Sequence, residues 1–350
     1  FAASRTRDLD VPRTDRMNTG FGQTEPASEE WFYKLQDRER YVLAYDDRSA
    51  GGLTDQMQVR LSLRRYQEDR QRLDTGSTTR RLESDQTDTV GLGVDWRKAL
   101  GEDHLLTWGL DLDFDQVDSV RDDVDTGTGV VTPKDGTFAP DSQYLSSGVF
   151  LQDEIFALEH FDVTAGLRYS YFGFSFDDFD SGEETDGSFD ALTASLQVAR
   201  DVGQGSRVTA TLAQGFRAPN LADLAKNGGF FAGEELANPD LDPEQSWMAE
   251  LAWDYVRPTW SVGTAVYYNE IDDAIGARLV DEGDPGTPGD EVYQRDNVGE
   301  LRYAGVELRA ATKLGGADSP WSARVVAESI WGRQFDDTAD PNTGEQPFYD

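Results

Sequence analysis

The most constraining feature of the sequence is an alternation of apolar and polar residues with a period of two, which recurs along most of the chain. In the stretch from Leu106 to Phe114, every second residue is apolar and the residues between them are Thr107, Gly109, Asp111 and Asp113. Side chains of a β-strand point alternately to opposite faces, so this pattern predicts strands with one face in an apolar medium and the other in a polar one. The same pattern occurs at residues 57–64, 90–97, 161–171, 192–198, 247–255, 260–268, 306–310 and 321–331.

The alternation predicts an all-β chain with about twelve strands, most of them longer than the ~5–6 residues usual in globular proteins. Residues 1–39 are charged and weakly patterned, so we expect them to form a connection or loop, with the β-structure in residues 40–350. The chain begins at Phe1 without a signal-like stretch, and we interpret it as part of a longer protein.

Composition excludes several classes of site. The chain has no cysteine and two histidines, His104 and His160, which argues against disulfides, thiolate zinc sites, Fe–S clusters and His-rich metal sites. No Gly-x-Ser-x-Gly, P-loop or His-Glu-x-x-His motif is present, so we expect no catalytic residues, no cofactor, no metal and no enzyme activity. No apolar run approaches the ~18 residues of a membrane-spanning helix. If the protein crosses a membrane, the sequence therefore predicts that it does so as a closed barrel of alternating strands.

The charge balance is strongly acidic, with 67 Asp and Glu residues against 32 Lys and Arg residues and a formal net charge of -35. This surplus argues against nucleic acid as a partner, because nucleic-acid binding needs a basic surface. The favoured interpretation is a solvated acidic surface suited to salt or to solubility. The alternative is acidic loops that attract cationic or metal-bearing ligands. Three acidic clusters on Gly-containing loops offer oxygen ligands suited to Ca²⁺, although none has EF-hand spacing; they are 122–125, 177–180 and 281–284.

Connection lengths alternate along the chain, which separates a membrane barrel from a soluble sandwich. Outer-membrane barrels have short turns at the periplasmic end and long loops at the extracellular end. The tryptophans also favour a barrel, because they lie near strand ends on the apolar face, where interfacial aromatic girdles occur. The short connections are 49–54, 101–103, 158–160, 201–206, 257–258 and 315–320, and the longer ones are 74–78, 122–141, 177–187, 217–243 and 281–290.

Several segments, in order, resemble the TonB-dependent outer-membrane receptors. The most specific is Gly-Phe-Arg-Ala-Pro-Asn-Leu-Ala-Asp-Leu at 215–224, followed by Asn-Pro-Asp-Leu-Asp-Pro-Glu at 238–244. Gly-Val-Phe-Leu-Gln-Asp-Glu at 148–154, Tyr-Tyr-Asn-Glu-Ile-Asp-Asp-Ala-Ile at 267–275 and Asn-Val-Gly-Glu at 297–300 are similar to further parts of that family. The resemblance covers roughly residues 40–335.

The resemblance implies a transmembrane antiparallel up-and-down β-barrel, of which this chain supplies about twelve strands of a larger barrel; plugged barrels have about 22. It implies a receptor in the bacterial outer membrane that imports a scarce nutrient with energy from TonB, through an N-terminal plug segment missing here. The expected cargo is an iron chelate such as a ferric siderophore, with cobalamin or haem as the alternative. Outer-membrane lipid and the small-molecule nutrient are the other expected partners, and the receptor is expected to be a monomer.

Candidate ligand-binding residues lie in the long loop between the two motifs. Arg217 at the strand exit is expected to pair with carboxylates such as Asp223 or Glu244, or to contact an anionic ligand. Phe230 and Phe231 are candidates for stacking on a ligand or for packing the loop. Haem ligation is disfavoured because residues 220–237 contain no histidine, although tyrosine can also ligate haem iron. The complete candidate set is Arg217, Asn220, Asp223, Phe230, Phe231, Asn238 and Glu244.

Two alternatives of a different class stay open from the sequence. A passive porin-like channel would share the alternation and lack the motif pair at residues 217–219 and 238–239. A soluble β-sandwich or adhesin would bury its apolar strand faces against a second sheet.

Overall fold

A computed structural model describes residues 1–49, 51–156, 158–179, 181–230, 233–283, 291–335 and 348–349, and for residues 229, 230, 348 and 349 it describes the backbone alone. Nearly all regular structure is β-strand. The strands are β1 (Ala2–Pro12), β2 (Ser28–Asp47), β3 (Gln56–Asp74), β4 (Thr79–Leu100), β5 (His104–Asp125), β6 (Val131–Asp135), β7 (Ser142–Ile155), β8 (Phe161–Asp177), β9 (Glu184–Gly203), β10 (Ser206–Arg217), β11 (Gly228–Phe230), β12 (Gly233–Leu236), β13 (Glu244–Val256), β14 (Trp260–Asp272), β15 (Ile275–Asp281), β16 (Glu291–Asn297), β17 (Glu300–Lys313), β18 (Ser322–Phe335) and β19 (Phe348–Tyr349).

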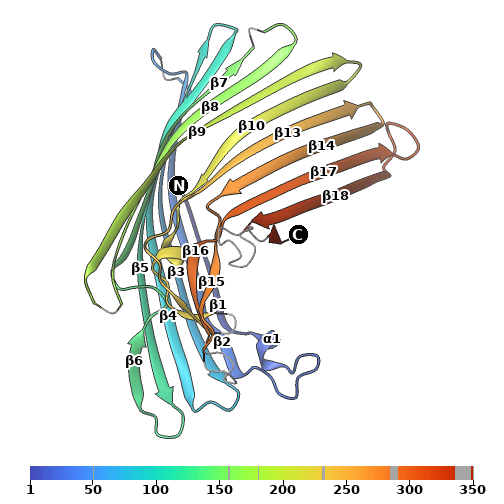
Figure 1. The fold of residues 1–350 in the computed structure, drawn as a ribbon. Helices are drawn as coiled ribbons and strands as arrows, with labels where there is room; N and C mark the ends of the chain where they lie inside the picture. Colours follow the sequence, from blue (N-terminus) through green and yellow to red (C-terminus); the bar gives the residue numbers. More distant parts are fainter. Residues whose placement is uncertain are drawn as a thin grey trace, which may run out of the picture.

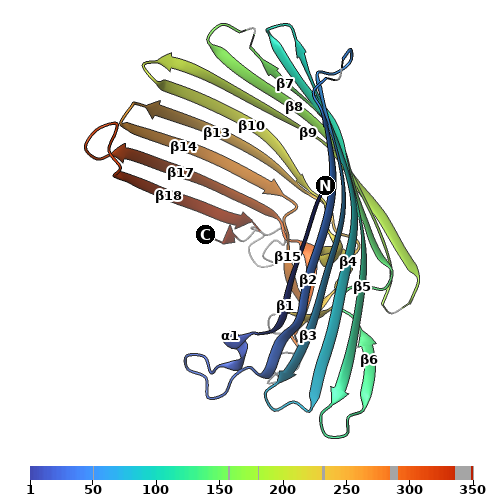
Figure 2. The same cartoon turned by 180° about the vertical axis from the view of Figure 1, so that it is seen from behind.

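One sheet of 15 strands contains all the long strands, and its neighbours follow the order of the chain. Each described pairing within it is antiparallel, which confirms the up-and-down arrangement. Figures 1 and 2 show the sheet as one curved wall that is open between β1 and β18. A second sheet, in the order β11-β12-β16-β15, lies on the concave side of the wall near the end where the longer loops gather.

The two faces of the wall differ as the alternation predicts. The outer face exposes large apolar side chains, among them Leu112, Leu167 and Leu251. The inner face carries charged side chains that pair across strands: Arg168 of β8 holds both carboxylate oxygens of Asp111 of β5 at 2.9 and 2.7 Å. In the described part of the chain no second sheet covers the outer apolar face, so the soluble-sandwich alternative is wrong.

The two ends of the wall also differ, because the connections 13–27, 218–243 and 273–299 all lie at one end. The predicted alternation of short and long connections holds in part: 75–78 at that end is shorter than 48–55 and 314–321 at the other. The β9–β10 turn has only two residues, Gln204 and Gly205, and their φ angles of 55° and 79° are the left-handed values that tight hairpins require. Aromatic rings gather at this short-turn end. Trp96 stacks on Trp108 with ring centroids 6.2 Å apart. On β13 Trp253 stacks on Tyr255, whose ring also contacts Trp260 of β14 at a tilt of 49°. Their position fits an interfacial girdle.

The expectation for residues 1–39 is wrong, because β1 and most of β2 lie there and only residues 13–27 connect them. These strands are charged on both faces and pair through groups such as Arg5 and Asp37, whose Nε and Oδ1 atoms lie 3.0 Å apart. A membrane strand needs only about 9–11 residues to cross the bilayer. β2 has 20 residues. Strand segments beyond the bilayer are wet on both faces and show no apolar alternation.

Residues 122–125 were expected to open a long connection, but they belong to β5, and the hairpin partner β6 continues the sheet there. The described helices are α1 (Thr14–Met17) and α2 (Leu221–Leu224). Neither has the length or the apolar character needed to cross a membrane.

The buried core of the described chain lies at the long-loop end, on the inner face. The inner sides of β5, β7 and β8 supply Val117, Tyr144, Phe174 and Phe176. The segment from 218 to 243, between β10 and β13, supplies Leu221, Leu224, Ala225 and Leu241. The wall therefore packs against this loop, and the loop folds inward into the mouth.

Candidate functional site

The motif loop, residues 218–243, begins and ends at a pair of residues that face each other across two strands. Arg217 is the last residue of β10 and is directly opposite Glu244, the first residue of β13. Nη1 of Arg217 lies 3.0 Å from Oε1 of Glu244. The strand register therefore closes the neck of the loop with an ion pair between its two ends.

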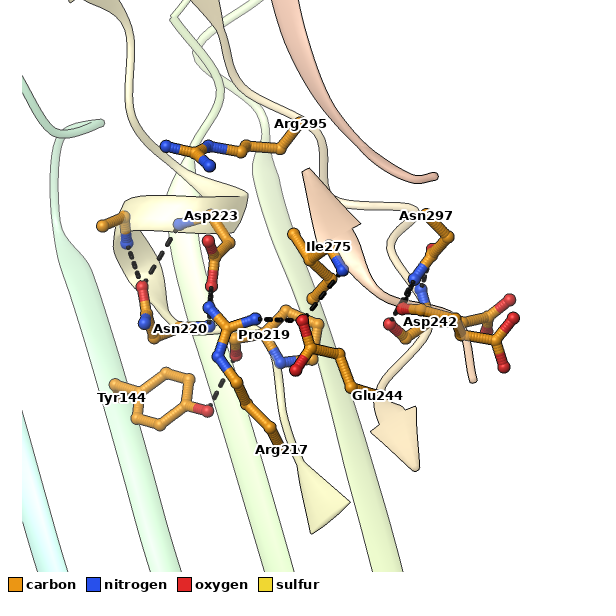
Figure 3. Close-up of polar contacts among 12 residues, drawn as sticks. Tyr144, Arg217, Pro219, Asn220, Asp223, Asp242, Glu244, Ile275, Arg295 and Asn297 are labelled. Carbon is orange, nitrogen blue, oxygen red and sulfur yellow. Dashed lines mark hydrogen bonds and ion pairs between the residues drawn. The ribbon is translucent and has the colours of Figure 1, made fainter. Parts of the chain in front are cut away.

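Arg217 also reaches into the loop. Its Nη2 atom lies 2.6 Å from Oδ2 of Asp223, whose side chain is 7% exposed, so one guanidinium bridges two carboxylates (Figure 3). A planar guanidinium has donors in a fork that suits two acceptors at once. The expected structural pairing of Arg217 with Asp223 and Glu244 is confirmed.

Asp223 in turn shapes the first turn of the loop. The amide of Asn220 donates to Oδ2 of Asp223 at 3.1 Å, and Oδ1 of Asn220 accepts from the amides of Ala222 and Asp223 at 2.8 and 3.2 Å. This reciprocal arrangement is a capping box that starts α2. Asn220 and Asp223, both candidate ligand-binding residues, are thus occupied in holding the loop.

The floor of the loop is aromatic. The hydroxyl of Tyr144 donates to the carbonyl oxygen of Pro219 at 2.8 Å, and both groups are buried. Burial, together with the nearby charge of Asp223, raises the pKa of Tyr144, which lies two residues from the long-loop end of β7, so the hydroxyl keeps the proton that it donates. Phe174 stacks on Phe189 with centroids 5.6 Å apart below the loop.

A second long connection, residues 273–299, is tied to the motif loop. The amide of Ile275 donates to Oε1 of Glu244 at 2.8 Å, so Glu244 joins both connections. Nδ2 of Asn297 donates to the carbonyl oxygens of Asp242 and Asp273 at 2.9 and 2.7 Å, and its Oδ1 accepts from the amide of Asp242 at 2.9 Å. Figure 3 shows these contacts beside the Arg217 pair.

Asn238 and Glu235 complete this network. Nδ2 of Asn238 donates to the carbonyl oxygen of Arg295 at 2.6 Å, and its Oδ1 accepts from the amide of Asp240 at 3.1 Å. Glu235 is 1% exposed and lies between Nζ of Lys226 at 2.9 Å and Nε of Arg295 at 2.6 Å. The sequence carries no signal for Glu235, since it lies in an irregular Gly-Glu-Glu-Leu stretch and its partners are 9 and 60 residues away.

The structure therefore brings four candidates, Arg217, Asn220, Asp223 and Glu244, into one cluster. It places Asn238 two residues after the end of β12, where it bonds to the carbonyl oxygen of Arg295. Phe230 ends β11, and its side chain is outside the described atoms; Phe231 lies outside the described residues.

A cavity of about 480 Å³ lies beside the motif loop. Its walls are the long-loop ends of β3, β4 and β5, the segment around β6, and the strands β11 and β12. None of the candidate residues with described side chains lines it. The motifs of the sequence do not point to this cavity. The available signal was the density of arginines at residues 70–81 in an acidic chain.

In the described part of the chain, carboxylates of the acidic clusters accept hydrogen bonds from backbone amides of their own turns. Oδ1 of Asp125 accepts from the amides of Gly127 and Thr128 at 3.1 and 2.7 Å, and Oδ1 of Asp178 accepts from the amide of Ser181 at 2.8 Å. These are turn-capping contacts. Asp180 and Asp284 lie outside the described residues.

One group of carboxylates in the described residues comes close enough to share a cation: Glu270, Asp272 and Glu300 have ligand atoms within 4.8 Å of one another. Arg302 already pairs with Glu300 and with Glu270. The arrangement is therefore an ion-pair network on adjacent strands.

Comparison with known proteins agrees with this architecture. The family model "TonB dependent receptor-like, beta-barrel" matches residues 2–349. The vitamin B12 transporter BtuB of Vibrio vulnificus (strain CMCP6) is 26% identical over 187 residues, covering 53% of this chain and 23% of that protein. The ferric enterobactin receptor PirA of Pseudomonas aeruginosa is 25% identical over 214 residues, covering 56% of this chain and 26% of that protein. The chain thus spans about a quarter of the length of these relatives.

Solved structures show the same fold. The copper transporter OprC superposes with a TM-score of 0.73 at 15% identity, covering 89% of this chain and 48% of that one. The ferric citrate transporter FecA, in its unliganded form, gives a TM-score of 0.63 at 14% identity, covering 95% and 47%. On the match of the family model over nearly the whole chain, this protein belongs to the TonB-dependent receptors, the bacterial outer-membrane β-barrel family.

Proposed function

We propose that the chain is the barrel portion of a receptor that imports a scarce nutrient across the outer membrane with energy from TonB. The observation that carries this proposal is the inward fold of the motif loop. Tyr144 and the Arg217 ion pairs hold the loop against the inner wall, where it narrows the mouth and forms one side of a cavity. A fixed loop over a lumen suits a receptor that must capture its ligand before transport.

A passive porin-like channel is the competing function. Such a channel needs a lumen that stays open to its solutes. The motif pair at 217–219 and 238–239, with the contacts of Arg217 and Asn238, favours the receptor.

We propose an iron chelate, such as a ferric siderophore, as the cargo, with cobalamin and haem as alternatives. The names of PirA and FecA refer to ferric complexes, and the name of BtuB refers to vitamin B12. Haem is the less favoured alternative. His104 begins β5 and contacts Asp153 at 2.8 Å, and His160 precedes β8, so both histidines lie at the short-turn end, away from the motif loop.

TonB is the proposed energy-coupling partner, through an N-terminal plug segment of the parent protein outside these 350 residues. A binding screen of the intact receptor against ferric siderophores, haem and cobalamin tests the cargo. We expect tightest binding for a ferric siderophore. Tight haem binding that is abolished only by replacing a tyrosine would contradict the proposed cargo.

A further inference from the structure

The cavity beside the motif loop has a charge balance unlike the rest of the chain. Six cationic and five acidic side chains line it, whereas the whole chain has 67 acidic residues and 32 cationic ones. The cations come from separate elements that meet only in the folded structure. A cavity in which cations gather against such an acidic background is an unusual local environment, and it indicates a task beyond solubility.

Strand register places like charges directly opposite each other in this cavity. Arg72 of β3 faces Arg81 of β4, and Arg121 of β5 faces Lys134 of β6. All four side chains line the cavity. Like charges directly opposite on adjacent strands destabilise a sheet. On their other sides Arg81 faces Asp123 and Arg121 faces Glu83, so the like-charge pairs are offset in part.

Only part of that compensation is present within the described chain. Arg72 donates to Asp74 at 2.6 Å, and Arg121 holds Asp123 through two contacts at 2.9 and 2.8 Å. Arg81 and Lys134 have no hydrogen bond or ion pair to any described residue. Both cations therefore remain available to a ligand.

Arg81 is the more constrained of the two. It lies two residues from the long-loop end of β4, a strand of 22 residues, and so beyond the 9–11 residues that cross a bilayer. Its side chain is half-buried, and burial, followed by the charges of Arg121 and Arg72, lowers the pKa of Arg81 below its ordinary value. A partly desolvated guanidinium beside Arg72 and Arg121 gains from a further oxyanion, in addition to the nearby carboxylates of Glu83 and Asp123.

We propose that this cavity binds the cargo through a multivalent oxyanion, with carboxylate or phosphate-like oxygens, and that Arg81 and Lys134 are its principal contacts. Arg72 and Arg121 flank the site and make its electrostatic potential more positive. Trp31 closes one side; its ring lies 4.9 Å from the guanidinium carbon of Arg72. The inference rests on the proposed receptor function, and it assigns an anionic cargo class to a cavity separate from the motif-loop cluster.

The test uses the intact receptor, purified in detergent, and isothermal titration calorimetry with citrate and with inorganic phosphate as probes. Choline is the cationic comparator. We expect citrate to bind more tightly than phosphate, choline not to bind, and added salt to weaken the binding. Arg81→Gln and Lys134→Gln should each weaken citrate binding about tenfold, the effect of losing one charge-assisted contact.

Arg64→Gln is the matched control. Arg64 is on the inner face of the same strand as Arg72 and pairs with Asp113 at 2.5 Å, but it is eight residues, or about 26 Å of strand, from Arg72. This variant removes the same charge and should leave citrate binding within about twofold of wild type, since long-range effects of an exposed charge are screened. Lys134 is exposed on β6, so Lys134→Gln tests the site even if Arg81→Gln fails to fold.

Equal binding by wild type, Arg81→Gln and Lys134→Gln would overturn the assignment. So would binding of choline as tight as that of citrate, or no anion binding by the intact receptor, as expected if an acidic residue of the parent protein fills the site. TonB-dependent uptake is measured separately. Uptake without anion binding would contradict only the proposed anion site. Anion binding without TonB-dependent uptake would contradict the proposed receptor function.

Discussion

The hydroxyl of Tyr144 donates a 2.8 Å hydrogen bond to the carbonyl oxygen of Pro219, a residue 75 positions later in the chain. The bond joins the inner face of β7 to the start of the motif loop. Since both partners are buried, neither can exchange its partner for bulk water. The bond therefore anchors the loop to the barrel wall, independently of the contacts within the loop.

Tyr144→Phe should release the start of the motif loop. The change keeps the ring and leaves the buried carbonyl of Pro219 without its partner, a loss of about 1–3 kcal/mol. Hydrogen–deuterium exchange of the intact receptor should show the amides of Leu224 and Ala225, which are bonded within α2, exchanging about tenfold faster or more. Tyr171→Phe, on the outer face of β8, is the control and should leave these amides unchanged.

A double-mutant cycle tests the bridge between Arg217 and Asp223. Arg217→Gln leaves the nearly buried carboxylate of Asp223 without its charged partner. Asp223→Asn removes the negative charge that the guanidinium of Arg217 neutralises. The double variant should lose less stability than the sum of the single changes, by about 1.5–3 kcal/mol, the value of a charge-assisted hydrogen bond. Loop stability is read from amide hydrogen exchange in the two single variants and the double variant. If the double variant loses as much stability as the two single variants together, Arg217 and Asp223 are not coupled, and Arg217 would again be a candidate ligand contact.

Phe174→Ala should loosen the loop from below. Phe174 is 7% exposed and stacks against Phe176 and Phe189 under Leu221 and Leu224. Removing a buried Phe side chain costs about 3–5 kcal/mol. Limited proteolysis of the intact receptor should then cut within 218–243 faster than in wild type. Tyr171→Ala removes an exposed aromatic of the same strand and should not change cleavage; equal sensitivity of the two variants would mean that the aromatic floor does not hold the loop.

The parts of the fold that the sequence predicted are those governed by the bilayer. In β5, Leu110, Leu112 and Phe114 alternate with aspartates, because one face of the strand contacts lipid and the other contacts water. This alternation can be recognised in the sequence. In β1 and the first half of β2 both faces carry charged residues, and Trp31, Phe32 and Tyr33 follow one another in β2, so no period of two marks the strands. Between Tyr171 and Phe176 the inner face carries aromatic rings in place of polar residues, because Phe174 and Phe176 belong to the core that packs against the motif loop and Phe172 packs against that core, while Tyr171 is exposed on the outer face.

Some contacts of the site could be predicted from the sequence and others could not. Arg217 and Glu244 could be paired from sequence because they end the two strands that flank one loop. The placement of Arg81 and Lys134 in one cavity could not be predicted, since it depends on the register of β3 to β6 and on residues 226–236, far along the chain from both. The cluster of Glu235 with Lys226 and Arg295 is of the same kind.

The assignment of the two faces has a test at adjacent residues of β9. These 350 residues contain no cysteine, so Ser195→Cys and Leu196→Cys each place one spin label here in the intact receptor, reconstituted in lipid after any cysteine elsewhere has been replaced by serine. Leu196 is on the apolar outer face and Ser195 on the inner face, because neighbouring strand residues point to opposite sides. The label at 196 should be relaxed by oxygen dissolved in the bilayer, and the label at 195 should not. The reverse result would show that the face assigned to the lumen contacts lipid, which would contradict the assignment of the two faces.

The most direct test of the receptor function is uptake of the ferric siderophore selected by the binding screen, measured with radioactive iron in cells that carry the intact receptor. Paired strains should differ only in the presence of TonB. We predict accumulation in the strain with TonB and its loss, down to the level of cells without the receptor, in the strain lacking it. Equal uptake in the two strains would contradict energised import and would make the protein a passive channel.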